Sequence, residues 1–318
     1  MTSIEQLLDS IATFDVTALR EAVIAGANIN DPVQFGCFSF LEKVATAYGP
    51  QPNKYDEMTS YVRTAVALGA ETRRALFRTA TLTPDAPEFL FALIQAGADV
   101  NQVDDNKSTP LIHLVRHLPN IDQDPGVIDI LLAAGADVEY VDKDGDTALL
   151  LAVRSGKNHF AARLLMAGAD PNKATASRNS PYVTYWDTLS DTPAQIGILK
   201  LMLARGAEID VRNPSSNAKP TPLIRAASKS AIENVKVLLA AGADPCLTDL
   251  NGRSALDLCG KGLSGSERFS PRTNFCRRIL STAMAAREVQ RGIRTVTGAI
   301  ALDELADYPR GTRDRQVL

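Results

Sequence analysis

A short pattern, Gly-Ala followed by a small polar or acidic residue, recurs along the whole chain at uneven but similar steps. Its seven glycines, 28 to 43 residues apart, are Gly26, Gly69, Gly97, Gly135, Gly168, Gly206 and Gly242. Self-similarity at periods of about 20 to 50 residues is typical of repeat architectures, in which each small unit buries its apolar face against its neighbours. We therefore expect a stack of similar units rather than one central core.

The boundaries of two helices can be located in each repeat. Every one of the seven glycines follows an apolar stretch, such as residues 127–134 and 235–241, and glycine ends helices because it enters the left-handed conformation without a steric clash. A Ser or Thr followed by Pro or Ala marks helix starts, since the hydroxyl caps a backbone N–H and proline fits the first turn. These starts stand at Thr109, Thr147, Ser180, Thr221 and Ser254.

A Thr-Pro-Leu start followed by a Gly-Ala-Asp end resembles the ankyrin repeat over about residues 3 to 285, and most closely over residues 142–170. The resemblance implies an all-α fold, an ankyrin-repeat solenoid of stacked helix-turn-helix units with short β-hairpin fingers. The family's histidine after the leucine is absent, so its hydrogen bond between repeats is expected to be missing. In its place stand Ile112, Leu150, Val183, Ile224 and Asp257.

The spacing divides the chain into four segments. Residues 1–36 are predicted to be an N-terminal capping repeat, 37–262 the repeat array, 263–294 degenerate or capping helices and 295–318 a tail. The repeats are uneven in length, which predicts an irregular stack.

Three irregular stretches lie within or after this array. Residues 49–53 are expected to form a loop between two helices, and residues 213–219 a long polar finger. In the tail, Leu302 and Leu305 are flanked by acidic residues, which indicates either a short amphipathic docking segment or a frayed end.

The resemblance implies a function in protein binding, without catalysis, through a concave face of finger tips and inner-helix ends. We predict a scaffold, adaptor or inhibitor, with a bacterial or viral effector or a toxin-neutralising protein as narrower forms. The positions carried over from the family are Asp105, Asn106, Arg116, His117, Lys143, Asp144, Asp146, Arg154, Arg178, Tyr185, Trp186, Lys219, Lys229, Asn251 and Arg253. The alternative is an adaptor that recruits a ubiquitin ligase or another modification machine through its C-terminal region, where residues 274–280 are a loose match.

Tyr185 and Trp186 stand where inner helices of the family usually carry alanine. Adjacent residues point to different sides of a helix, so we expect that the two are not both buried. Tyrosine and tryptophan are enriched at interface hot spots, which favours a partner contact. The interpretation that stays open is a pocket, opened by the lengthened repeat, that the two aromatic side chains fill.

Composition limits the remaining partners. A net charge of -3 gives no reason to expect nucleic acid, and no apolar run reaches the roughly 20 residues that span a bilayer. The first residues do not have the pattern of a signal peptide, and four cysteines without paired spacing suit a reducing compartment. We expect a cytoplasmic protein, or one in the host cytosol if it is a secreted effector, monomeric when free.

No metal or cofactor is expected from the chemistry of the side chains. His113 and His117 have the spacing of two zinc ligands on one helix, but the glutamate that follows the first histidine in zinc proteases is replaced by Leu114. A group of arginines between residues 272 and 294 forms either a solvated helix face or a site for an acidic partner.

Overall fold

The computed structural model describes residues 2–31, 38–48, 54–82, 86–118, 126–174, 179–187, 191–261 and 270–290. Within these ranges the chain is helical, and the single β interaction is an isolated antiparallel bridge between Thr248 and Ser254. The predicted all-α fold is confirmed, and the described fingers are built from turns. The predicted loop at 49–53 and the tail at 295–318 lie outside these ranges.

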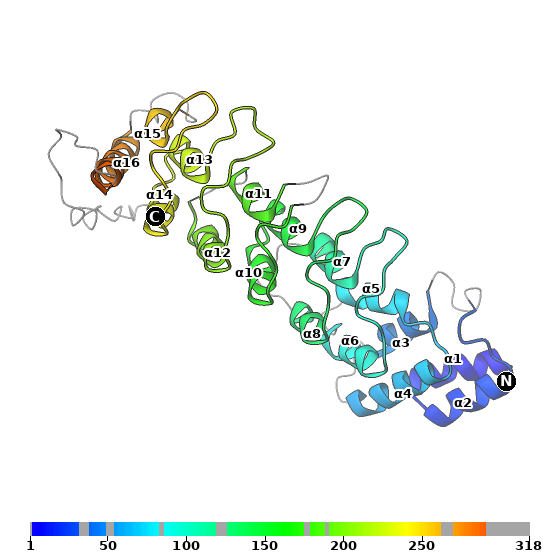
Figure 1. Ribbon diagram of the computed structural model, residues 1–318. Helices are drawn as coiled ribbons and strands as arrows, with labels where there is room; N and C mark the ends of the chain where they lie inside the picture. Colours follow the sequence, from blue (N-terminus) through cyan, green and yellow to red (C-terminus); the bar gives the residue numbers. More distant parts are fainter. Residues whose placement is uncertain are drawn as a thin grey trace. The chain divides into compact units, whose positions relative to one another are not determined.

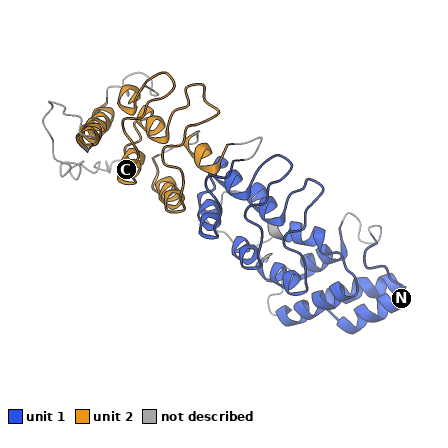
Figure 2. Ribbon diagram, viewed as in Figure 1, with its two compact units in different colours: residues 1–178 blue, residues 179–318 orange. Residues whose placement is uncertain are grey.

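The chain forms two compact units, residues 1–178 and residues 179–318 (Figure 2). The boundary falls inside the segment that the spacing predicts as one array. The first unit contains α1 (Ser3–Thr13), α2 (Val16–Ile24), α3 (Phe40–Tyr48), α4 (Tyr55–Ala67), α5 (Arg73–Leu82), α6 (Ala86–Gln95), α7 (Pro110–His117), α8 (Val127–Ala133), α9 (Ala148–Arg154) and α10 (Asn158–Met166).

Helices of the first unit pack in two rows (Figure 1). The inner row runs through α1, α3, α5, α7 and α9, each in contact with the next, and the outer row through α2, α4, α6, α8 and α10. Each inner helix also contacts the outer helix that follows it. Every pair thus buries apolar surface against its own partner and against the neighbouring pair, as a repeat stack requires.

The second unit continues the pattern with α11 (Pro181–Asp187), α12 (Pro193–Ala204), α13 (Pro222–Ser228), α14 (Ile232–Ala240), α15 (Ala255–Leu258) and α16 (Pro271–Gln290). Here α11, α13 and α15 pack in sequence, as do α12, α14 and α16. The long helix α16 also contacts the short α15.

Local sequence accounts for both ends of these helices. The hydroxyls of Thr109, Thr147 and Thr221 each accept a hydrogen bond from the backbone N–H three residues later, at 3.1 to 3.4 Å. All seven glycines of the Gly-Ala pattern have φ between +83° and +100°, the left-handed region that ends a helix. The predicted helix starts and stops are therefore confirmed.

Four of the five residues that replace the family's histidine lie in the apolar interior, and the fifth, Asp257, is exposed. Ile112, Leu150, Val183 and Ile224 are all buried. Apolar contact thus takes the place of that hydrogen bond. No helix in the described part of the chain is long and apolar enough to cross a membrane.

Candidate partner-binding fingers

One carboxylate holds each of three finger turns. In the first unit Asp104 Oδ1 accepts backbone hydrogen bonds from Asn106 (2.9 Å) and Ser108 (2.8 Å). Asp142 Oδ1 accepts the equivalent pair, both at 2.9 Å, and in the second unit Asp249 Oδ1 does so at 2.9 and 3.0 Å. Hydrogen bonds to a carboxylate are stronger than neutral ones, so these turns are ordered before any partner binds.

The fourth residue of each turn adopts a positive φ: Lys107 at 53°, Gly145 at 78° and Gly252 at 72°. Its N–H donates to the carbonyl of the carboxylate residue at 2.9 to 3.1 Å. The three turns therefore share one backbone design, which presents the second and third residues outward.

The tips of the two fingers in the first unit are polar and exposed. They carry Asp105 and Asn106 on one finger and Lys143 and Asp144 on the next. The Lys143 ammonium donates to the Asn106 amide oxygen, and Asp105, with 93% of its side chain exposed, lies 3.4 Å from Arg73. Exposed pairs of this kind contribute about 0–1 kcal/mol, so the tips can exchange these contacts for a partner's at little cost.

Two arginines connect the inner helices to the second finger. Arg116 on α7 binds Asp142 and lies 3.3 Å from Asp144, while Arg154 on α9 makes a two-fold contact with Asp146 at 2.8 Å for each N–O pair. Asp146 was predicted to contact a partner, but its side chain is only 2% exposed. That prediction is wrong, because the carboxylate is used to anchor Arg154.

His117 lies at the exposed end of α7, beside His113 at 4.3 Å between ring centroids. The ring of His113 also packs edge-on against Phe77 at 5.3 Å. Burial, followed by the neighbouring His117 and Arg116, lowers the pKa of His113, although Asp104 opposes the effect. In the described residues no group of three His, Cys, Asp or Glu side chains is placed to hold a metal ion.

The second unit presents its own finger residues. Asn251 is exposed at a tip, and Arg253 binds the buried Asp249 through its guanidinium at 2.8 Å. Lys219 stands exposed in the long finger with φ at 42°, whereas Lys229 is half-buried at the end of α13. Arg178, also predicted to bind a partner, lies outside the described residues.

Tyr185 and Trp186 are both buried, at 2% and 3% exposure, so the expectation that one of them would face a partner is wrong. An inner helix of a stack has neighbours on more than one side. Tyr185 faces the outer helices, where its hydroxyl lies 3.0 Å from both the Gln195 carbonyl and Asn234 Oδ1. Trp186 faces α13 and the long finger.

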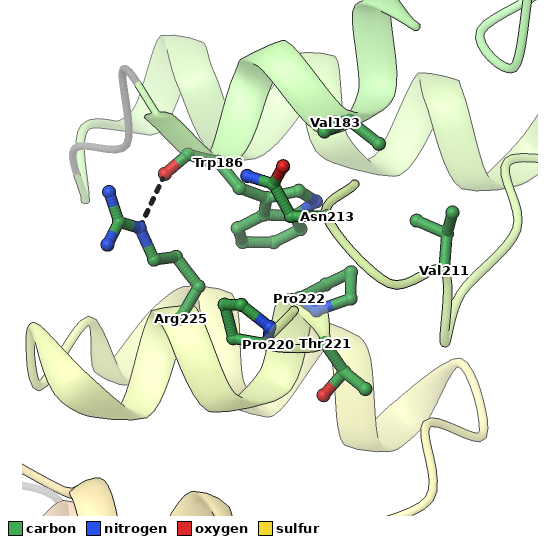
Figure 3. A pocket seen from close by; sticks show the side chains of 8 residues that line it. All are labelled: Val183, Trp186, Val211, Asn213, Pro220, Thr221, Pro222 and Arg225. Atoms are coloured by element: carbon green, nitrogen blue, oxygen red, sulfur yellow. Dashed lines mark hydrogen bonds between the residues drawn. The ribbon is translucent and has the colours of Figure 1, made fainter. Parts of the chain in front are cut away.

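Figure 3 shows Trp186 beside Asn213 and Pro220, which stand at the two ends of the long finger. The indole lies among Val183, Asn213 and Pro222, and the Arg225 guanidinium donates to the Trp186 carbonyl at 3.4 Å. Its ring meets that of Tyr185 edge-on, with centroids 4.9 Å apart. The burial of both side chains agrees with the pocket-filling interpretation, although most of the lengthened stretch near residues 173–179 lies outside the described residues.

Sequence reasoning missed a ladder of polar side chains that joins neighbouring repeats. The residue four positions after a repeat's glycine accepts a hydrogen bond from the backbone of the next repeat, two residues after that repeat's glycine. Asn30, Asn101 and Glu139 do so at 2.7 to 2.9 Å, and Asp210 at 3.3 Å. The recurrence of asparagine at this position, in residues 30, 101 and 172, was the available signal.

Lys157 also joins neighbouring repeats, and the sequence pattern did not reveal this. Its buried ammonium donates to the carbonyls of Val115 and Leu118, both at 2.6 Å, and so caps the C-terminus of α7 from the following repeat. Burial lowers the pKa of Lys157 because the charged form loses contact with water.

Two family models match the chain on these helix pairs. Residues 77–175 match a model of three ankyrin repeats, and residues 221–250 match a model of one ankyrin repeat. A search of the curated proteins finds none that matches.

Solved structures show distant likenesses. The human ASB11 ankyrin repeat domain is 19% identical, with a TM-score of 0.43, and the match covers 85% of this chain and 96% of that chain. The ankyrin repeat domain of Bcl-3 is 18% identical with a TM-score of 0.47 and 86% and 97% coverage. One chain in the structure of the Bd0816 predatory endopeptidase from Bdellovibrio bacteriovorus in complex with immunity protein Bd3460 is 21% identical, with a TM-score of 0.46. The match covers 65% of this chain and 97% of that chain.

At such identities and TM-scores the family assignment rests on the two model matches and on the repeated helix pairs, each begun by a capped Ser or Thr and ended by a left-handed glycine. The chain contains ankyrin repeats over residues 77–175 and 221–250.

Proposed function

We propose that this protein binds a partner protein, without catalysis, through the finger tips and inner-helix ends of its first unit. Ankyrin repeats are protein–protein interaction modules, and this coarse function follows from the family. The finer proposal rests on one observation: the turns at Asp104 and Asp142 are fixed by hydrogen bonds while their tips stay exposed.

A fixed turn supports binding for an energetic reason. Ordering side chains and loops on association costs about 0.5–1.5 kcal/mol for each flexible side chain, and this cost is lower where the backbone is ordered beforehand. The tips combine both signs of charge: Asp105 lies close to Arg73 and Asp144 close to Arg116, while Lys143 binds Asn106. We infer a partner surface that is polar and also carries both signs, so that charge pattern rather than net charge selects it.

The direct test reverses two opposite charges at the finger tips. We expect the Asp105→Lys/Lys143→Glu double variant to fold normally and to bind the partner that co-purifies with the wild type at least about tenfold more weakly. The measurement is the Kd for that purified partner.

A matched control is available on the outer helices of the same unit. Asp129 on α8 and Arg163 on α10 form an ion pair, with 46% and 44% of their side chains exposed. The Asp129→Lys/Arg163→Glu variant keeps the same net charge and should bind normally. Equal losses in the two double variants, or no loss in the first, would contradict the proposal.

The action on the partner, as scaffold, adaptor or inhibitor, stays a prediction, as do the roles of effector and toxin-neutralising protein. The adaptor alternative depends on residues 274–280, which lie in α16. There Cys276, Ile279 and Leu280 are buried within the second unit. Three of the four apolar side chains of this stretch are therefore used in packing, and the fourth, Phe275, is half-buried, which favours the finger surface as the binding site.

A further inference from the structure

A hollow of about 540 Å³ lies between α14 and α16 in the second unit. Its lining is largely apolar, with four small side chains, Ala240, Ala243, Ala283 and Ala286, beside the larger Leu239 and Ile279. Small side chains leave room for a further apolar segment to approach the two helices closely. We call this hollow the α14–α16 groove.

Two cations line the same groove. Lys236 comes from α14, where it also binds Glu233 at 3.0 Å, and Arg287 comes from the last turn of α16. An occupant that suits the α14–α16 groove would therefore carry a narrow apolar stripe bordered by acidic residues.

The chain itself contains such a segment shortly after α16, outside the residues that the structure describes. On a helical projection, Ala299, Leu302, Leu305 and Ala306 share one face. Asp303 borders this face, and Glu304 and Asp307 lie on the opposite face. Pro309 follows directly, and proline ends such a segment.

We propose that residues 299–308 dock into the α14–α16 groove of the same chain. The linker permits it, because the 12 residues from Gln290 to Leu302 span up to roughly 40 Å when extended, and α16 ends beside the groove. Tethering makes the segment's local concentration far higher than that of any free competitor. Leu302 and Leu305 then cover the apolar lining, and Asp303 at the border of the stripe lies toward the cations Lys236 and Arg287.

The test measures hydrogen exchange of residues 236–245 and 279–287 in the full chain. Replacing both leucines with aspartate (Leu302→Asp/Leu305→Asp) should raise exchange in both segments by about tenfold or more, because two apolar contacts are lost. The variant changes no residue of the packed helices, so the second unit keeps its fold.

The control is Ile300→Asp, which places one extra charge on the acidic face of the same segment and should leave exchange unchanged. Docking within one chain also predicts exchange that does not depend on protein concentration. Unchanged exchange in the double variant, an equal rise in the control, or a rise on dilution of the wild type would overturn the proposal. The last outcome would assign the groove to the tail of a second copy.

Discussion

At the scale of single residues, a few positions per repeat determine the backbone and leave the rest free. The left-handed glycines end the helices, the turn carboxylates Asp104, Asp142 and Asp249 shape the fingers, and the ladder residues such as Asn101 bind the next repeat. Each acts through backbone hydrogen bonds or backbone conformation, which recur in several of the described repeats. Function is thereby left to the neighbouring exposed positions.

Two glycines of one helix provide a test of the backbone role. Gly206, with φ at +83°, ends α12, whereas Gly197 lies inside α12, and an added Cβ meets nothing within 4 Å at either position. We expect Gly206→Ala to lower the free energy of unfolding by about 1–2 kcal/mol, since a Cβ penalises the left-handed region. Gly197→Ala should raise it by about 0.5–1 kcal/mol. Chemical denaturation measures both, and equal effects would contradict the assignment.

Asp249 predicts a specific response to acid. Burial alone would raise the pKa of its carboxyl, but hydrogen bonds from the Arg253 guanidinium and from the backbone N–H groups of Arg253 and Asn251 outweigh burial and lower the pKa. A carboxyl with a lower pKa in the folded state adds stability above its unfolded pKa of about 3.9, and this stability is lost as the pH falls through the folded pKa.

We therefore expect the finger at Asp249 to open in acid before the helices unfold. The measurement is the exchange rate of the Asn251 and Arg253 amides, corrected for intrinsic pH dependence, at neutral pH and well below the unfolded carboxyl pKa. Asp249→Asn should remove most of this pH dependence. A variant that titrates as the wild type does would assign the transition to another group.

At the scale of helices, neighbours stabilise one another's ends. The C-terminus of α7 is capped by Lys157 from the repeat that follows, so that α7 depends on a residue about 40 positions away. The inner helices owe their burial to neighbours in the same way. Tyr185 and Trp186 could both be buried because Tyr185 faces α12 and α14 while Trp186 faces α13.

Removal of the lysine cap should destabilise the first unit. In Lys157→Met the buried carbonyls of Val115 and Leu118 lose their donor, and we expect a loss of about 1–3 kcal/mol in the free energy of unfolding. Lys143→Met removes an equal charge from an exposed finger tip and should change it by less than about 0.5 kcal/mol. Denaturant titration of both variants measures these free energies. An unchanged free energy of unfolding in Lys157→Met would mean that water replaces the lysine cap.

At the scale of the whole molecule, packing and recognition are assigned to different residues. Trp186, the only tryptophan of the chain, belongs to the packing of the second unit, whereas we propose that the exposed tips of the first unit contact the partner. Mutations at these two kinds of position should therefore produce different phenotypes.

Trp186→Ala tests this separation. Removing a large buried aromatic side chain costs about 3–5 kcal/mol, so we expect hydrogen-exchange protection of α11 and α13 to fall strongly. Asp105→Lys, at a tip, should leave hydrogen-exchange protection in its own unit unchanged but weaken the binding of the partner. A Trp186→Ala protein with wild-type protection would show that the indole contributes little to packing.

The sequence by itself determined the repeat, the ends of its helices and the family resemblance. These depend on local rules: Thr221 caps the helix that it precedes, and Gly242 ends the one that it follows, whatever surrounds them. Tertiary structure decided which polar and aromatic side chains face inward. The burial of Trp186 and Asp146 depends on residues of other segments, the long finger and Arg154, whose positions no local pattern of the chain encodes.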